Sequence, residues 1–235
     1  MTSHDDSTRY PVPGQDARPK DRPWPRLAWP PPAGMTLTGQ LTELRVADPD
    51  RDGAALFEAL DFDAVWQHVA SRPGGPADWS QLLTARMAAG MLPWVLVLRR
   101  PCAGLAAGAL AGTSTYSDVS VGDARLEIGS TAYHPAAWGT AVNADAKLVL
   151  LSYAFGELGA GRVQLKTDVR NVRSQRAIAA LGARYEGTLR RYQRRGDGTV
   201  RDTALFSITA EDWPAARAMI ERRLAGRLAA LDAVS

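Results

Sequence analysis

The sequence has a single cysteine, Cys102, among 235 residues, so no disulfide can form within the chain. It has only three histidines, and no Cys or His cluster stands at the spacing of a metal site, so we expect no metal. Nowhere do 18 uncharged apolar residues run together, and MTSHDDSTRY, the first ten residues, lacks the pattern of a secretory signal. We therefore expect a soluble, cytoplasmic protein in a reducing compartment, with no membrane partner.

A strong charge bias is also missing, because 28 Lys and Arg residues stand against 25 Asp and Glu residues. This near balance argues against a dedicated nucleic-acid-binding protein, although it would suit an anionic ligand. Hydrophobic residues make up 46% of the chain, enough for one large domain with a sizeable core. We find no internal repeat.

Proline is concentrated at one end, since 8 of the 15 prolines fall within residues 1–34. Each proline fixes φ and removes a backbone donor, which excludes a helix or a central strand there. We predict a flexible, proline-rich arm over residues 1–34. Trp24 and Trp29 leave open the alternative that the arm docks on the body or on a partner.

From residue 35 the pattern becomes that of a folded domain. Residues 37–48 alternate as an opening strand, and Asp48 is placed to start a helix with Ala54, Leu56, Phe57 and Leu60 on its buried face. A second helix is predicted over residues 76–90. Three antiparallel strands are then predicted over residues 93–100, 105–119 and 124–134.

The second half alternates helices and strands. A strand over residues 162–169, a helix over 171–182 and a hairpin over 187–209 that turns at 196–198 follow a long apolar helix. Thr209 and Asp212 have the spacing of a capping box for a closing helix, with Ile220, Leu224, Leu228 and Leu231 on one face. The order of elements predicts one mixed α/β sheet.

The stretch AYHPAAWGTAVNADAKLVLLSYAF, residues 132–155, leads from a strand through a loop of small residues into that apolar helix. The first N–H groups of a helix have no partners within it, and the helix dipole makes this end positive. Gly139, Thr140 and Ala141 would let a phosphate or pyrophosphate approach these groups closely. A glycine at such a turn also has an ordinary structural role. Neither a P-loop nor the G-x-G-x-x-G pattern of dinucleotide folds is present.

Several short motifs follow one another in the second half of the chain: Glu127-Ile128-Gly129, His134-Pro135, Trp138-Gly139-Thr140, Asn143 to Lys147, Asn171-x-x-Ser174, and Leu181-Gly182-Ala183 followed by Glu186-Gly187. Together they resemble the acyl-CoA-binding half of GNAT-superfamily acetyltransferases, in the RimJ/RimL-like branch that acetylates N-terminal alanines of ribosomal proteins. The resemblance covers residues 35–213 and is strongest over 125–206. It leaves the arm at 1–34 and an amphipathic helix at 214–235 unexplained.

The resemblance implies an α/β (α+β in some schemes) domain with a mixed, twisted, largely antiparallel sheet of about seven strands and helices on both faces. The sheet would splay open between its fourth and fifth strands, with the pantetheine arm of acetyl-CoA in the gap. One departure is Ala136, where the family has Gln or Arg, so one polar contact to the pyrophosphate would be lost. The residues implied in coenzyme binding are Tyr133, His134, Trp138, Gly139, Thr140, Ala141, Val142, Asn143 and Asn171.

Acyl transfer to an amine needs a neutral amine and a proton for the leaving thiolate. Ser174 is implied as the proton donor, although Asn171 and Ser174 also have the spacing of ordinary helix-capping residues. Glu127 is implied as a base or water-holding carboxylate; the alternative is a structural carboxylate paired with Arg125 or another cation. For His134 we favour a structural role because no Ser or Asp partner pattern accompanies it. Cys102 lacks a paired histidine, which argues against a nucleophile.

The expected function is acetyl transfer from acetyl-CoA to a primary amine, by direct attack in a ternary complex. A protein or peptide N-terminus is the first candidate, because an α-amine with a pKa of about 7.7–8.0 is partly neutral at pH 7 while a lysine at about 10.4 is not. A small-molecule amine, another donor such as succinyl-CoA, a non-catalytic acyl-CoA-binding module and a homodimer remain open. For a basic hairpin that contains Arg190, Arg191, Tyr192, Arg194, Arg195 and Arg201, the default interpretation is a solvated face; the alternatives are contact with an acidic acceptor or with RNA.

Overall fold

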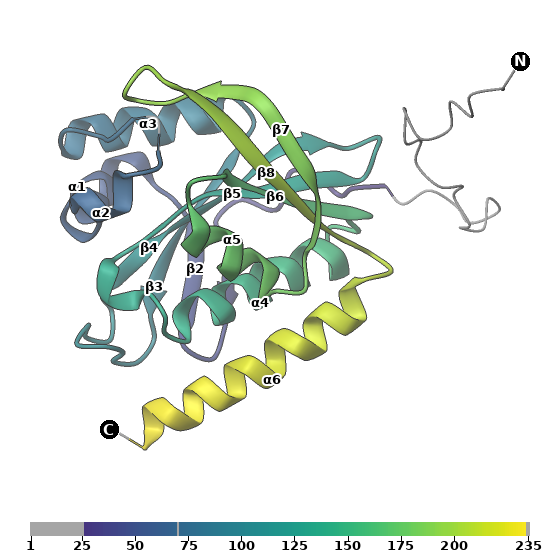
Figure 1. The fold of residues 1–235 in the computed structure, drawn as a ribbon. Coiled ribbons are helices and arrows are strands. Elements are labelled where there is room, and N and C mark those ends of the chain that lie inside the picture. The colour runs from purple at the N-terminus through teal and green to yellow at the C-terminus, as the bar shows by residue number, and fades with distance from the viewer. Residues whose placement is uncertain (1–25, 70, 234–235) are drawn as a thin grey trace, which may run out of the picture.

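The computed structural model describes residues 26–69 and 71–233, which form one eight-stranded sheet with helices packed on it (Figure 1). The strand order is β1-β2-β3-β4-β5-β6-β8-β7, and every neighbouring pair is antiparallel except β5 and β6. The predicted mixed, largely antiparallel sheet is confirmed. Trp24 and most prolines of the predicted arm lie outside the described residues.

The predicted opening strand consists of two short strands, β1 (Thr36–Thr38) and β2 (Thr42–Val46), which pair with each other. The turn between them is held by Asp145, whose carboxylate accepts hydrogen bonds from the backbone N–H groups of Gln40, Leu41 and Thr42. This break is why the sheet has eight strands rather than about seven.

The first helix, α1 (Pro49–Leu60), begins where it was predicted to begin. The side chain of Asp48 accepts hydrogen bonds from the N–H groups of Asp50 and Arg51, at 3.1 and 3.3 Å. Leu56 and Leu60 are buried and Phe57 is half-buried, but Ala54 is exposed, so its assignment to the buried face was wrong. The helix is rotated so that Gly53 is buried instead, where α1 packs on α3.

A short helix, α2 (Asp63–Trp66), was not predicted, whereas α3 (Pro76–Ala88) was. Successive residues of β3 (Leu92–Leu98) show how the helices are layered. Trp94 and Leu96 belong to the larger core, which includes buried residues of α4 (Val142–Gly156), while Val95 belongs to a smaller core with α1 and α3. Because side chains alternate across a strand, α1 and α3 cover the face opposite to α4. Helices on both faces are confirmed.

The sheet opens between β5 (Arg125–Tyr133) and β6 (Arg162–Asp168). These strands pair only over Arg125–Glu127 and Arg162–Gln164, and they separate from Ile128 onward. β5 continues beside β4 (Leu110–Ser120), and β6 pairs along its whole length with β8 (Val200–Thr209). The predicted splay is confirmed. It follows the fifth strand instead of the fourth because the opening strand is broken in two.

The chain ends with α5 (Val172–Ala179), the β7–β8 hairpin with β7 at Arg184–Arg194, and α6 (Trp213–Asp232), which packs on α4. The hairpin turns at residues 196–198, as predicted. Ile220, Leu224 and Leu228 of α6 are buried and Leu231 is half-buried. Thr209 and Asp212 do bond to each other, but they do so in the turn before the helix, so α6 begins at Trp213.

The last part of the predicted arm packs on the body. Leu27 is buried, the N–H of Ala28 donates to the carbonyl of Leu158 at 2.8 Å, and the ring of Trp29 lies edge-on to that of Tyr116.

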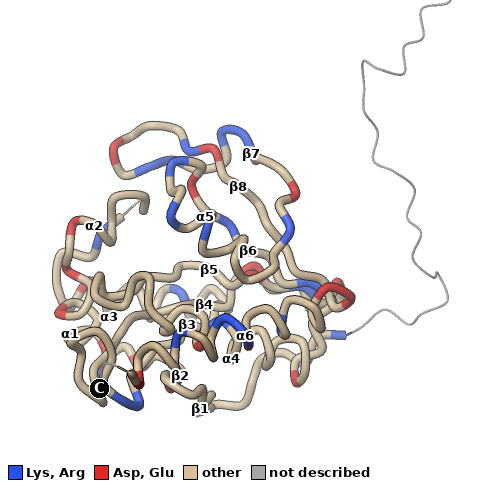
Figure 2. Tube along the Cα trace, turned by 60° about the horizontal axis from the view of Figure 1, so that its bottom comes forward, with Lys and Arg blue, Asp and Glu red and all other residues tan. Residues whose placement is uncertain are grey.

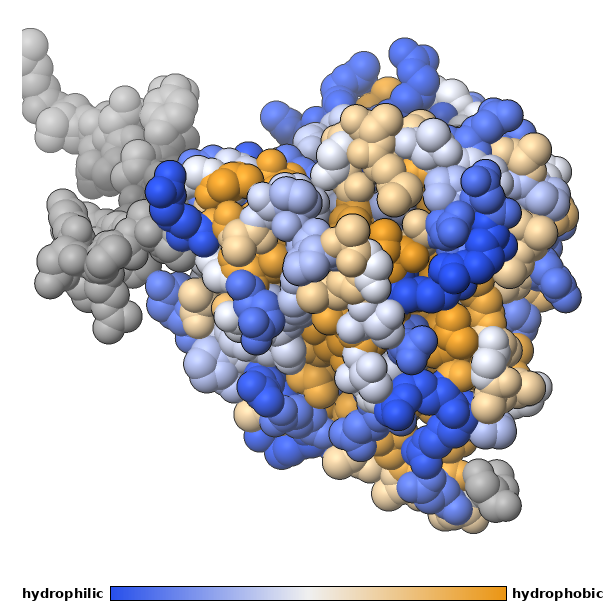
Figure 3. All heavy atoms as spheres, turned by 180° about the vertical axis from the view of Figure 1, so that it is seen from behind, coloured by the Kyte–Doolittle hydropathy of each residue, from blue (hydrophilic) through white to orange (hydrophobic). Residues whose placement is uncertain are grey.

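On the face drawn in Figure 3, apolar and charged residues are mixed, and they do not form one continuous apolar patch. None of the helices within residues 26–69 and 71–233 has the length and apolar character to cross a bilayer.

Candidate active site

A cavity of about 620 Å³ lies where β5 and β6 separate, and it reaches from the segment after α2 to α6. It brings together eight of the predicted site residues: Glu127, Tyr133, Trp138, Gly139, Thr140, Asn143, Asn171 and Ser174. The other three do not line it. Ala141 and Val142 are buried, so only their backbone could face a ligand. His134 accepts a hydrogen bond from the N–H of Ala136 at 3.1 Å and packs its ring against Phe62.

The loop before α4 leaves several backbone donors free. Gly139 has a φ of 74°, in the left-handed region that favours glycine. The Oγ1 of Thr140 donates to the carbonyl of Ala137 at 2.6 Å and accepts from the N–H of Val142 at 3.2 Å. No other described residue accepts a hydrogen bond from the N–H groups of Gly139, Ala141, Asn143 or Ala144. The helix therefore presents unpaired donors beside the cavity, as a site for an anion requires.

Four arginines surround this end of the cavity: Arg173 and Arg176 on α5, and Arg223 and Arg227 on α6. Backbone and aromatic groups position three of them. Arg227 donates to the carbonyls of Gly139 and Thr140, Arg223 donates to the carbonyl of Ala180, and the guanidinium of Arg173 lies 3.5 Å from the centre of the Trp138 ring. Within the described residues none of the four has a carboxylate partner, so their charges are available to an anionic ligand.

Glu127 lies in the cavity and is paired with a lysine. Its Oε2 is 2.7 Å from Nζ of Lys166, while Arg125 bonds Asp118 and Asp123 instead. A Cβ at Gly129 would lie 2.5 Å from Oε1 of Glu127, so glycine makes room for the carboxylate above the strand. Burial raises the pKa of Glu127 above its ordinary value, and Lys166 opposes that shift. The cation paired with Glu127 is therefore Lys166 and not Arg125. The role of Glu127 as a base stays a prediction.

Ser174 and Asn171 lie side by side at the start of α5. The Oδ1 of Asn171 accepts a hydrogen bond from the N–H of Ser174 at 3.0 Å, so the expected capping role of Asn171 is confirmed. The hydroxyl of Ser174 has no hydrogen-bond partner among residues 26–69 and 71–233 and lines the cavity. Asn171 therefore caps α5 while the hydroxyl of Ser174 stays available as a proton donor.

Lys147 is a buried cation that sequence reasoning missed. It lies on the sheet-facing side of α4, where its Nζ donates to Oγ of Ser114 at 2.9 Å and to Oγ1 of Thr131 at 2.7 Å. Thr131 lies in an irregularity of β5, since the register with β4 shifts between Thr113 and Thr115. Burial lowers the pKa of Lys147 to about 7, with no carboxylate to oppose it.

Replacing Lys147 by methionine should change how stability depends on pH. An unfolded lysine has a pKa of about 10.4, so between pH 7 and pH 10 the unfolded chain binds more protons than the folded one. The unfolding free energy of the unmodified protein should therefore rise with pH in this window, by up to about 1.4 kcal/mol per pH unit, relative to that of Lys147→Met. Urea unfolding of both proteins from pH 6.5 to 9.5 measures the difference. Parallel curves would show that the lysine titrates normally.

The predicted basic hairpin is not one solvated face. Arg195 forms a buried ion pair with Asp168 at 2.6 Å, Arg201 lines the cavity, and the hydroxyl of Tyr192 accepts a hydrogen bond from Lys166. Of the five arginines, Arg190, Arg191 and Arg194 are exposed. Figure 2 shows basic segments along β7 at the upper edge of the molecule. This division leaves little continuous basic surface for RNA.

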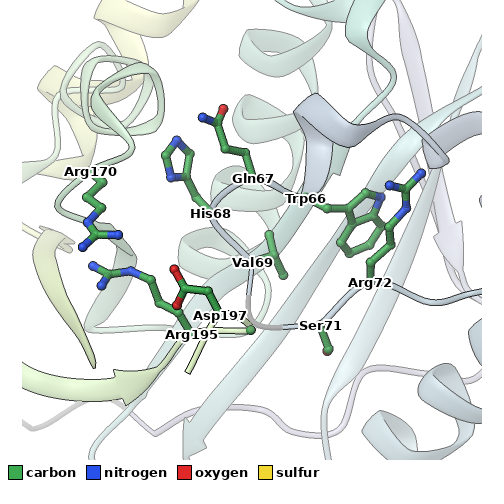
Figure 4. A pocket seen from close by; sticks show the side chains of 10 residues that line it. Trp66, Gln67, His68, Val69, Ser71, Arg72, Arg170, Arg195 and Asp197 are labelled. Carbon is green, nitrogen blue, oxygen red and sulfur yellow. The ribbon is translucent and has the colours of Figure 1, made fainter. Parts of the chain in front are cut away.

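A second pocket of about 310 Å³ adjoins the cavity (Figure 4). Residues 66–69, Ser71 and Arg72 line one side, and Arg170, Arg195 and Asp197 approach from the other. His68, Val69 and Ser71 line both spaces, so the pocket lies beside the segment after α2, and no described residue of α6 lines it. Cys102 is buried and lines neither space, and the described residues contain no cluster that could hold a metal ion.

Comparison with known proteins gives consistent matches. The family model described as "Acetyltransferase (GNAT) domain" matches residues 42–184. A crystal structure of an acetyltransferase-like protein from T. thermophilus is 32% identical, with 83% of this chain and 99% of that chain covered and a TM-score of 0.72. None of the curated proteins matches the chain.

Two more distant structures share the fold. Mycobacterium smegmatis RimJ in complex with CoA-disulfide is 24% identical, with 83% of this chain and 96% of that chain covered and a TM-score of 0.69. Ribosomal-protein-S5-alanine acetyltransferase from Vibrio fischeri is 18% identical, with 76% and 98% covered and a TM-score of 0.63. At these identities the likeness is one of fold.

Proposed function

The chain belongs to the GNAT family of acetyltransferases, and from this premise we propose that it transfers an acetyl group from acetyl-CoA to a primary amine, with an N-terminal α-amine of a protein or peptide as the first candidate. The observation that carries the proposal is the single cavity that joins the free N–H groups at the start of α4 to Ser174 and Glu127. A small-molecule acceptor is the second candidate, because the smaller pocket beside α2 is open to one.

The residues of the cavity fit the coenzyme. The N–H groups of Gly139, Ala141, Asn143 and Ala144 would bind the pyrophosphate, and the arginines of α5 and α6 would compensate its charges. The gap between β5 and β6 would receive the pantetheine arm, whose amides can pair with the strand edges left free there. Ala136 offers no polar side chain, and Arg227 supplies a cation at the same loop instead.

Acetyl-CoA supplies an activated thioester, and the chain's own residues orient the amine and move protons. Glu127 would accept a proton from the incoming amine, directly or through a water molecule, since its raised pKa makes it a better base than an exposed carboxylate. Ser174 would donate a proton to the departing thiolate. An α-amine needs little further help, because it is partly neutral near pH 7.

The direct test is a liberated-thiol assay with acetyl-CoA and peptides that differ in their N-terminal residue, beside spermidine and an aminoglycoside. We expect thiol release that depends on the acceptor, with mass spectrometry locating the acetyl group on the α-amine. Binding of CoA by calorimetry without release for any acceptor would support a non-catalytic module. No heat from CoA, acetyl-CoA or succinyl-CoA would contradict the proposal.

The arginines of α6 give a second measurable consequence. In the double variant Arg223→Gln and Arg227→Gln, the Kd for CoA should rise about tenfold or more, because two charge-assisted contacts to phosphate are lost. Calorimetry with CoA and with dephospho-CoA shows whether the 3′-phosphate is the group they bind. Arg222→Gln, an exposed neighbour on the same helix, is the control and should bind CoA normally. Unchanged affinity in the double variant would contradict this role of α6.

A further inference from the structure

Two guanidinium groups in the cavity have buried N–H groups without an acceptor. Nη1 of Arg86, near the end of α3, and Nε of Arg201, on β8, are both buried and bond to no other described residue. A buried cationic donor without a partner is costly, and an anion bound in the cavity would remove that cost. Neither arginine forms an ion pair within residues 26–69 and 71–233.

Arg86 and Arg201 line the cavity from elements that carry none of the predicted coenzyme-binding residues. Arg86 belongs to α3, which covers the sheet face opposite to α4 and from which it lines the cavity. Arg201 is close enough to Glu127 and Asp168 to interact with both electrostatically. The four arginines around the α4 loop are on other elements, α5 and α6.

The carboxylates that line the cavity form ion pairs with cations other than Arg86 and Arg201. Lys166 is paired with Glu127 at 2.7 Å, and Asp168 is paired with Arg195 at 2.6 Å, so both carboxylates of the cavity are already engaged. Arg86 and Arg201 have no carboxylate partner at ion-pair distance among the described residues. A cationic acceptor such as a polyamine would be repelled by these groups, whereas an acidic one would be attracted.

We infer that Arg86 and Arg201 bind a carboxylate of the reacting molecules, so that the enzyme acts on amines that carry an acidic group or uses an acyl group that carries one. The inference rests on the proposed function and names its substrate class. The planar guanidinium forms paired hydrogen bonds with a carboxylate, and the unbonded N–H groups are the donors that such a contact would use. The acidic group can come from the acceptor, such as an N-terminus followed by Asp or Glu, or from the donor, such as succinyl-CoA.

Matched substrates distinguish these two sources. The acceptor arm compares peptides that begin Ala-Glu and Ala-Gln, with acetyl-CoA as the donor. The donor arm compares succinyl-CoA with acetyl-CoA on the Ala-Gln peptide. In the arm that varies the source of the bound carboxylate, we expect kcat/KM to favour the acidic member by about 10- to 100-fold, the range of a hydrogen-bonded charge pair. The other arm should show no such preference. Equal rates within both arms would overturn the inference without any variant.

Variants then connect the preference to the two arginines. Arg86→Gln and Arg201→Gln should each reduce this preference, the ratio of kcat/KM for the acidic substrate to that for the uncharged one, at least threefold. Arg201→Lys should keep part of it. Arg217→Gln, which removes an exposed charge on α6, is the control. A preference that persists in both variants would overturn the assignment, and thermal melting checks that they fold. Absence of thiol release with every substrate would instead count against the proposed function.

Discussion

Replacing Ser174 by alanine should lower kcat by one to several orders of magnitude and leave the affinity for CoA nearly unchanged. The hydroxyl lines the cavity and has no hydrogen-bond partner in the described parts of the chain, so it is free to donate a proton to the departing thiolate. Loss of a positioned acid typically costs about 10²- to 10⁴-fold in rate. The cap at α5 survives the change, because Asn171 accepts from the backbone N–H of residue 174.

Three measurements separate this role from a structural one. Steady-state thiol release gives kcat, calorimetry gives the Kd for CoA, and thermal melting gives stability. Ser174→Thr should recover part of the rate because it restores a hydroxyl. Ser152→Ala, a half-buried serine on α4 that does not line the cavity, is the matched control. An unchanged kcat in Ser174→Ala would remove this residue from the mechanism.

The parts of the site that depend on local structure could be predicted from the sequence. The turn at Gly139, the free N–H groups after it and the cap formed by Asn171 each need only the residues next to them along the chain. The helix start at Asp48 is of the same kind. Propensity and capping rules describe such short-range geometry, and the order of elements then indicated the sheet.

The charges of the site could not be predicted, because tertiary packing brings them together. Arg227 reaches the carbonyl of Gly139 from a helix 88 residues away in sequence, and Arg86 comes from the opposite face of the sheet. In the sequence, Lys147 is an ordinary polar residue in an apolar helix. Only its packing against Ser114 and Thr131 makes it a buried cation. Broken strands and rotated helix faces, as at Ala54, also follow from long-range contacts.

Asp145 should have the largest effect on stability among the residues near the site. Its carboxylate is buried, with 1% of its surface exposed, and accepts four hydrogen bonds: from the N–H groups of Gln40, Leu41 and Thr42 at 2.9, 3.0 and 2.7 Å, and from Oγ1 of Thr42 at 2.7 Å. It thereby fastens the turn between β1 and β2 to the first turn of α4. Without the carboxylate, at least three of these buried donors would have no acceptor.

Asp145→Ala should therefore lower the unfolding free energy by about 3–5 kcal/mol, the cost of leaving several buried donors unpaired after partial relaxation of the turn. Asp145→Asn should lose less unfolding free energy, because its amide oxygen still accepts hydrogen bonds. It should still lose some, because its NH₂ group would face N–H donors. Urea unfolding measures both, with Asp123→Ala as an exposed control. A loss below about 1 kcal/mol would show that the turn finds other acceptors. Because the same helix turn presents the N–H groups to the coenzyme, CoA should also bind more weakly to Asp145→Ala, even at temperatures where it is folded.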